Sequence, residues 1–341
     1  MSLKKSFDYE LFELGDFTTQ NGMVLPNAKL AYKTYGKLQG EDPRVIVYPS
    51  WYSGTIADNE WLIGEDKTLD PRKFFIVVPC LFGNGQSSSP SNTPSPLDGP
   101  RFPKMTLYDN VRAQYRLLTE KLRIRKVYCV LGWSMGAQQS YQWAAQYPDY
   151  VERIAPFCGS AKTSEHNFVF LEGVKNALCA DAAWCQGEYT EQPRKGLRAL
   201  ARVYAGWGLS QSFYREKLYI NLGYASLEDF LVRFWEHYFQ QKDANNLLAM
   251  LWTWQNGDIS DNELYKGDFA KALRSVKAKV LLMPGRHDLY FPPEDSEIEC
   301  QHLANVIYKP IESIWGHWAG GPGTNPEDVE FIDKMLREFL V

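Results

Sequence analysis

A serine with the surroundings of a catalytic nucleophile lies near the middle of the 341-residue chain, in Gly132-Trp133-Ser134-Met135-Gly136. The apolar run of residues 127–131 predicts a buried strand before it, and residues 137–147 predict a helix after it. A strand that turns this sharply into a helix holds the serine at a strained backbone angle with its hydroxyl exposed. The five-residue pattern often arises by chance, but its strand-turn-helix setting favours a nucleophile over a small-residue turn.

A serine hydroxyl is a poor nucleophile until an imidazole takes its proton. With a nucleophile of this type, the order along the chain is serine, acid, histidine, and the last two lie on loops after late strands. His317 meets these conditions because it lies in a predicted loop after a strand, whereas His302 lies within a predicted helix. We therefore predict His317 as the base and assign no catalytic role to the remaining histidines, His166, His237 and His287.

The imidazole needs a carboxylate that orients it and stabilises its charged form. Asp288 directly follows the predicted buried strand of residues 280–284 and is the predicted acid. Asp295 is the fallback, but it falls inside the next predicted helix. The sequence thus predicts Ser134, Asp288 and His317 as a triad for acyl transfer through an acyl-serine.

The tetrahedral intermediate of acyl transfer needs two preorganised donors for its oxyanion. The amide of Met135, at the positive end of the helix after the nucleophile, is the first predicted donor. The second is the amide of Tyr52, in the loop after the predicted strand of residues 45–49. Trp51 and Ser53 stay open as alternatives, because the sequence does not fix the register of this loop.

The elements around these residues predict an α/β sheet. Residues 9–17 and 25–35, separated by the turn dipeptide Asn21-Gly22, predict an antiparallel hairpin at its edge. Short, continuously apolar runs are typical of parallel strands buried on both faces, and they occur at residues 45–49, 74–79, 127–131, 154–158, 280–284 and 306–311. Helices are predicted at residues 106–122, with Thr106 as the N-cap, 293–303 and 326–340.

The regular alternation of strand and helix stops over residues 163–268, where aromatic-rich helical stretches replace it. Five of the eleven tryptophans fall there, at positions 184, 207, 235, 252 and 254. We expect most of these aromatic residues to pack in a core and a few to line an acyl pocket. The predicted division is a core of residues 1–162 and 269–341, with a helical cap of residues 163–268 inserted after the sixth strand.

Composition limits the choice of partner and compartment. A net charge of −4 provides no basic field for nucleic acid or acidic lipid, so a small-molecule substrate is expected, with no nucleic-acid or membrane partner. The six cysteines have no metal-ligand spacing and are expected to be buried thiols of a reducing compartment. Residues 1–6 lack the apolar core of a signal peptide, and we expect a cytoplasmic protein without a metal site.

Several stretches beyond the serine motif make the chain resemble the homoserine O-acetyltransferase family of the α/β-hydrolase superfamily, from about residue 31 to the C-terminus. The similar stretches are residues 61–64, 69–70, 74–78, 103–114, 132–136, 143–144, 288–292 and 316–317. The resemblance implies an α/β-hydrolase fold with a mostly parallel central sheet, the Ser134, Asp288 and His317 triad, and an acyl-enzyme. It also implies a helical cap that narrows the entrance and a possible homodimer through that cap.

The chain departs from this family around the expected amino-acid substrate. The family usually has two glycines before the serine, where this chain has Trp133. Its acetyltransferases hold the homoserine carboxylate with an arginine of the first cap helix, where this chain offers Lys175, which lacks the planar two-bond clamp. The loop at residues 83–86 lacks the family's tyrosine, and Trp318-Ala319-Gly320-Gly321 follows His317 in place of an acidic residue.

These departures favour water as the acyl acceptor. The leading hypothesis is hydrolysis of a small carboxylic ester of the acetyl type, with Trp51, Trp133 and Lys175 contacting the substrate. The alternative is an acyl-CoA-dependent O-acyltransferase such as a homoserine O-acetyltransferase, in which acetyl-CoA is the donor. No cofactor is expected otherwise. A non-catalytic binding protein on the same fold is the third hypothesis.

Overall fold

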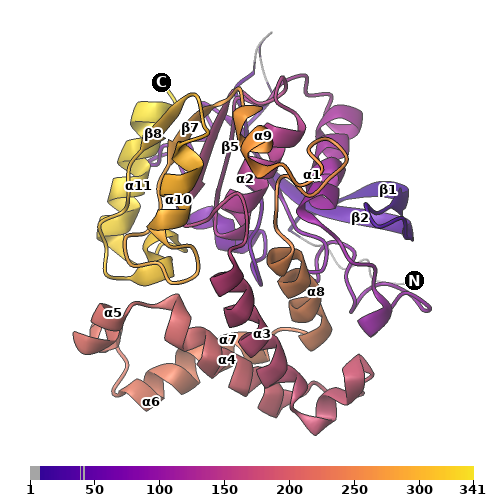
Figure 1. Ribbon diagram of the computed structural model, residues 1–341, viewed down its shortest axis with the longest axis vertical. Helices are drawn as coiled ribbons and strands as arrows, with labels where there is room; N and C mark the ends of the chain where they lie inside the picture. The colour runs from indigo at the N-terminus through magenta and orange to yellow at the C-terminus, as the bar shows by residue number, and fades with distance from the viewer. Residues whose placement is uncertain (1–7, 39, 41–42) are drawn as a thin grey trace.

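A computed structural model describes residues 8–38, 40 and 43–341 of the chain (Figure 1). The residues on which the expectation about a signal peptide rests, 1–6, lie outside these ranges. The described chain forms one sheet of eight strands: β1 (Glu10–Thr18), β2 (Val24–Tyr35), β3 (Val45–Val47), β4 (Phe75–Pro79), β5 (Cys129–Trp133), β6 (Arg153–Phe157), β7 (Lys279–Leu282) and β8 (Val306–Tyr308).

The α-helices of the described chain surround this sheet and fill the insertion between β6 and β7. They are α1 (Leu107–Arg116), α2 (Met135–Gln146), α3 (Glu165–Cys179), α4 (Arg194–Gly208), α5 (Gln211–Arg215), α6 (Leu227–Phe230), α7 (His237–Gln240), α8 (Ala244–Gln255), α9 (Phe269–Arg274), α10 (Pro293–Cys300) and α11 (Pro326–Phe339). Short 3-10 or π segments are η1 (Ala57–Leu62), η2 (Gly99–Arg101), η3 (Leu117–Lys121), η4 (Ala182–Gly187), η5 (Leu218–Ile220), η6 (Leu231–Glu236) and η7 (Gly316–Gly320).

The strand order is β1-β2-β4-β3-β5-β6-β7-β8, and only the pairs β1·β2 and β2·β4 are antiparallel. The predicted edge hairpin is confirmed, and its turn closes through a 2.9 Å hydrogen bond from the Gly22 amide to the Thr19 carbonyl. Gly22 has φ of 83°, a conformation that favours glycine. The mostly parallel sheet of an α/β-hydrolase fold is thereby confirmed.

The parallel strands are buried on both faces, as their continuous apolar runs predict. In β3, Ile46 packs in one apolar core, whereas Val45 and Val47 pack in the other. Successive side chains of a strand point to opposite faces, so the sheet separates the two cores. The core that contains Ile46 also contains aromatic residues of the insertion, such as Tyr204 and Trp254. The inserted helices therefore share a core with one face of the sheet.

Local sequence signals place the helix that leads to β5. The Thr106 hydroxyl accepts a hydrogen bond from the Asp109 amide at 3.1 Å, and the Asp109 carboxylate accepts one from the Thr106 amide at 3.1 Å. This reciprocal pair is a capping box, and it confirms Thr106 as the N-cap of α1.

In Figure 1, α3 to α8 gather at the bottom of the molecule, beyond one end of the sheet. The proposed cap comprises residues 163–268, and its last part packs against elements of the α/β core. Ile259 and Tyr265 pack in the core that excludes most of the insertion, and the Tyr265 hydroxyl donates to the Ala145 carbonyl of α2. Within the described ranges, no helix combines the length and apolar character needed to cross a membrane.

Glu299 has a carboxyl group on the buried side of α10. Its side chain is 2% exposed, and its Oε1 accepts a hydrogen bond from the Ala161 amide at 2.5 Å. Burial raises the pKa of Glu299 from 4.5 to about 8, although the Ala161 amide opposes the shift. Between these two values the folded chain holds a proton that the unfolded chain releases. Glu299 therefore lowers the stability progressively as the pH rises through this window.

Glu299→Gln should remove this pH dependence, because glutamine can still accept from the Ala161 amide but never ionises. The free energy of unfolding of the variant, relative to that of the wild type, should rise as the pH increases from 5 to 8. Denaturant unfolding at a series of pH values measures it. Glu297→Gln, at an exposed position of the same helix, is the matched control. A difference that stays constant with pH for Glu299→Gln would contradict the assignment.

Candidate active site

Ser134 lies at a tight turn between β5 and α2, with φ of 59° and ψ of −125°. A non-glycine residue in this conformation is strained, as expected for a nucleophile at such a turn. The strand and the helix approach each other closely beside it. A Cβ atom on Gly132 would lie 2.4 Å from the carbonyl carbon of Gly136, so glycine is required there. The predicted strand-turn-helix setting of Ser134 is thus present.

His317 and Asp288 are joined by a hydrogen bond of 2.7 Å between His317 Nδ1 and Asp288 Oδ2. The other carboxylate oxygen of Asp288 accepts from the amides of Tyr290 and Phe291, at 2.8 and 3.1 Å. These contacts fix the carboxylate and leave His317 Nε2 as the ring atom that can take a proton. Nε2 is buried and has no hydrogen-bond partner in the described part of the chain.

The alternative acid and base lie elsewhere. Asp295 is in the first turn of α10, and among the described residues no hydrogen bond joins it to His317. His302 lies just after the end of α10, where a continuous helix was expected, and it makes no hydrogen bond to Asp288 in the described structure. The geometry therefore pairs Asp288 with His317, as the order of residues along the chain predicts.

Trp133 connects the nucleophile turn to the histidine loop. Its Nε1 donates to the His317 carbonyl at 3.0 Å, and its ring stacks on the imidazole with centroids 4.8 Å apart. Trp51 packs edge-on against Trp133, with centroids 4.6 Å apart. Both indoles are buried. The structure gives Trp133 a positioning contact with His317, while the contacts of Trp51 and Trp133 with a substrate stay a prediction.

The two predicted oxyanion donors belong to segments that one side chain ties together. Gln139 Nε2 donates to the carbonyls of Ser50, at 2.8 Å, and Met135, at 3.0 Å. In the described structure the amides of Met135 and Tyr52 donate to no protein acceptor. Gln139 is not among the residues predicted from the sequence, although its place one turn after Met135 on the nucleophile helix is a usable signal.

Aromatic residues of the insertion pack against the loop that carries Asp288. Phe170 of α3 stacks on Tyr290 at 4.6 Å, and Trp254 of α8 stacks on Phe291 at 5.5 Å. Tyr290 and Phe291 in turn lie 4.7 and 5.7 Å from the His317 ring. The sequence predicts that a few cap aromatics line the site but does not identify which ones.

Polar contacts fasten the insertion to the same loop. The Tyr290 hydroxyl donates to the Tyr204 carbonyl of α4 at 2.9 Å, and the Asn167 side-chain amide donates to the Tyr290 carbonyl. The ring of Tyr52 stacks on Tyr204 with centroids 5.8 Å apart. The insertion therefore touches both the acid loop and the oxyanion loop.

Lys175 is not brought together with the triad. Its ammonium pairs with Glu172 on the same helix, and its side chain lines a cavity whose walls contain none of Ser134, Asp288 and His317. Across the described residues, no group of three or more His, Cys, Asp or Glu side chains could hold a metal ion.

Comparison with known proteins shows which family this chain belongs to and which proteins it resembles. Residues 49–321 match the model of the alpha/beta hydrolase fold family. The ethyl acetate hydrolase of Pseudomonas veronii is 40% identical, over 97% of this chain and 95% of its own length. The homoserine O-acetyltransferase of Chloroherpeton thalassium is 29% identical, over 98% of this chain and 90% of its own. The solved acetyl esterase MekB superposes with a TM-score of 0.95 at 39% identity, covering 99% of this chain and 98% of that one.

The chain belongs to the α/β-hydrolase fold family. Within it, the resemblance to homoserine O-acetyltransferases is confirmed, and the relatives with greater identity are esterases. The chain is accordingly an enzyme, either an ester hydrolase or an acyltransferase.

Trp133→Phe should slow catalysis, because phenylalanine keeps a ring beside His317 but leaves the His317 carbonyl without its donor. Loss of a buried hydrogen bond costs about 1–3 kcal/mol, so kcat should fall by about 5- to 160-fold with little change in KM. Steady-state kinetics with an acetate ester across pH 6–9 measure the kcat and KM of the variant and of the wild type.

Trp143→Phe is the matched control, because Trp143 is also buried and donates from Nε1 to Gln114 at 2.8 Å, but in the opposite core. It should lower stability without a comparable fall in kcat. Equal effects of the two variants on kcat would contradict the positioning role of Trp133.

Proposed function

We propose that this enzyme hydrolyses small acetyl esters through an acyl intermediate on Ser134, with Asp288 and His317 completing the triad. The observation that carries the proposal is the 2.7 Å hydrogen bond between Asp288 and His317, whose loop is joined by Trp133 to the strained turn of the next residue, Ser134. The likeness to an ethyl acetate hydrolase and to an acetyl esterase, at 40% and 39% identity, supports the substrate class.

In the first half-reaction the Ser134 hydroxyl attacks the ester carbonyl while His317 Nε2 takes the proton. The amides of Met135 and Tyr52 stabilise the negative oxygen of the tetrahedral intermediate. Collapse of the intermediate breaks the ester C–O bond, and the alcohol leaves with the proton from His317. Water then attacks the acyl-serine with His317 as base, which releases acetate and restores Ser134.

The position of Lys175 supports water as the acceptor. A homoserine acceptor requires a cation near the acyl-serine to hold its carboxylate. Lys175, which replaces the expected arginine, is paired with Glu172 and lies in the wall of a different cavity. Amino-acid acetylation would therefore need another cationic group.

The aromatic residues that pack around Tyr290, whose ring lies beside His317, support a small acyl group. Tyr52, Tyr204 and Trp254 are buried and pack against one another, with ring centroids 5.5 to 6.5 Å apart. Rigid rings packed at this density leave little room for a long acyl chain.

Two further parts of the proposal concern the whole molecule. Association into a homodimer through the cap is supported by Phe168 and Val169 of α3, which are 42% and 65% exposed. A cytoplasmic location, which provides a reducing environment, is supported by the free state of all six cysteines.

The partition of acetyl groups between water and homoserine tests the reaction. With 4-nitrophenyl acetate or acetyl-CoA as donor, purified enzyme should release acetate from the simple ester and form no acetylhomoserine. Ser134→Ala should abolish the release. Ser140→Ala is the matched control, because its buried hydroxyl donates at 2.9 Å to the Gly136 carbonyl on the same helix without touching the triad. Serine-dependent formation of acetylhomoserine faster than acetate would overturn the proposal in favour of an acyltransferase.

A further inference from the structure

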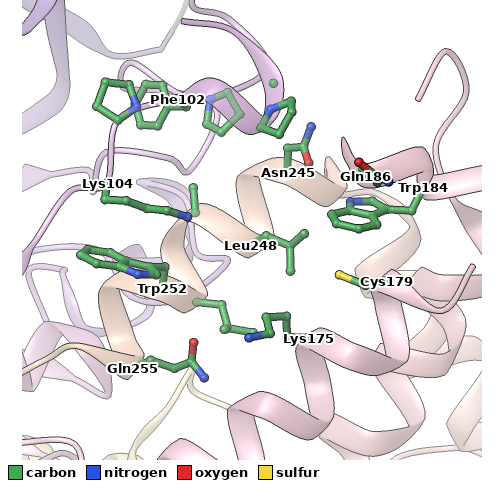
Figure 2. A pocket seen from close by; sticks show the side chains of 16 residues that line it. Phe102, Lys104, Lys175, Cys179, Trp184, Gln186, Asn245, Leu248, Trp252 and Gln255 are labelled. Atoms are coloured by element: carbon green, nitrogen blue, oxygen red, sulfur yellow. The ribbon is translucent and has the colours of Figure 1, made fainter. Parts of the chain in front are cut away.

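A cavity of about 310 Å³ lies between α3, α8 and the loop that precedes α1 (Figure 2). Its size is at the lower end of the range for small-molecule sites. Its walls combine cationic, aromatic and amide side chains, and no acidic residue lines it. The labelled residues in Figure 2 are Phe102, Lys104, Lys175, Cys179, Trp184, Gln186, Asn245, Leu248, Trp252 and Gln255.

Two lysines, Lys104 and Lys175, line this cavity. Lys175 is paired with Glu172, which also accepts from Gln255 Nε2 at 2.7 Å. Lys104 makes no ion pair and no hydrogen bond within the described structure, and its ammonium lies 5.7 Å from the centroid of the Trp252 ring. Burial and the positive charge of Lys175 lower the pKa of Lys104. Because Lys175 already has Glu172 as its counter-ion, an anion beside Lys104 would offset the one charge of this pair that has no partner in the described structure.

The rest of the wall suits a flat apolar body. Figure 2 shows Trp252 and Trp184 on either side of Leu248, with Lys104 reaching over Trp252. Indole faces stack on flat rings, and their large area makes them strong contacts for small ligands.

We propose that this cavity is a second ligand site, which binds a small organic anion with a flat, apolar body. The carboxylate of such a ligand contacts the ammonium of Lys104, and its body packs on Trp252 and Leu248. The site is separate from the triad, because none of the residues that line it belongs to the triad. The proposal does not depend on the catalysed reaction.

Three probes with the same ring and different charge test the site: benzoate, benzyl alcohol and benzylamine. Each is titrated into the Ser134→Ala enzyme by calorimetry, so that turnover does not contribute. Benzoate should bind with a Kd in the millimolar range or below, at least about threefold more tightly than benzyl alcohol, since an ion pair at a partly exposed site adds this much. Benzylamine should bind most weakly.

Lys104→Met keeps an unbranched apolar side chain and removes the charge. This variant should raise the Kd for benzoate by at least about threefold and leave the Kd for benzyl alcohol unchanged. Lys162→Met is the matched control, because Lys162 also lies over an aromatic ring, 5.9 Å from the centroid of Phe269, but outside the cavity. Trp252→Ala should weaken the binding of both benzoate and benzyl alcohol.

Three outcomes would each overturn the proposal. They are equal affinity for benzoate and benzyl alcohol, an unchanged Kd for benzoate in Lys104→Met, and no detectable binding of benzoate at about 10 mM. If Trp252→Ala does not fold, the comparison of Lys104→Met with Lys162→Met decides alone. If benzoate does not bind in this cavity, the proposed ester hydrolysis is not affected. That proposal is tested separately by the partition of acetyl groups between water and homoserine, which depends on Ser134.

Discussion

The close approach of β5 and α2 at Ser134 constrains everything around the reaction centre. The backbone can turn so sharply only because Gly132 presents no side chain to the Gly136 carbonyl. The turn places Ser134 at the end of a central parallel strand and the Met135 amide at the start of a helix. A strand buried on both faces and a helix buried along its length hold this arrangement, so the strain at Ser134 is supported by the two apolar cores.

The insertion contributes to the geometry of the triad as well as covering it. Asp288 receives two amides from its own loop, and that loop is held by the Tyr204 carbonyl and the Asn167 amide of the inserted helices. The stacking of Phe170 on Tyr290 adds an apolar contact to these polar ones. Displacement of α3 or α4 would therefore be transmitted to Asp288 through a short chain of direct contacts.

Local patterns in the sequence were sufficient to predict the individual strands, the edge hairpin and the N-cap at Thr106, because each depends on residues that are close in the chain. The pairing of Asp288 with His317 followed from their positions after late strands. The position of Lys175 and the bridge made by Gln139 could not be predicted in this way. They depend on how segments distant in sequence pack, and Trp133 reaches a carbonyl 184 residues away. Hydrophobic periodicity contains no information on such contacts.

The indole of Trp133 also restricts which sequences this lineage can adopt. A Cβ atom on Gly320 would lie 2.7 Å from Trp133 Cδ1, and one on Gly321 would lie 2.8 Å from Cδ2. Trp133 consequently requires glycine at 320 and 321, whereas the two glycines do not require the tryptophan. A single exchange at 320 or 321 would clash with the indole. A small residue in place of the indole would relieve the clash at 321, whereas a Cβ atom at 320 would still lie 2.7 Å from Cys158 Sγ. Evolutionary passage between this nucleophile turn and one with glycine at position 133 therefore has a preferred order, in which the tryptophan is gained last and lost first.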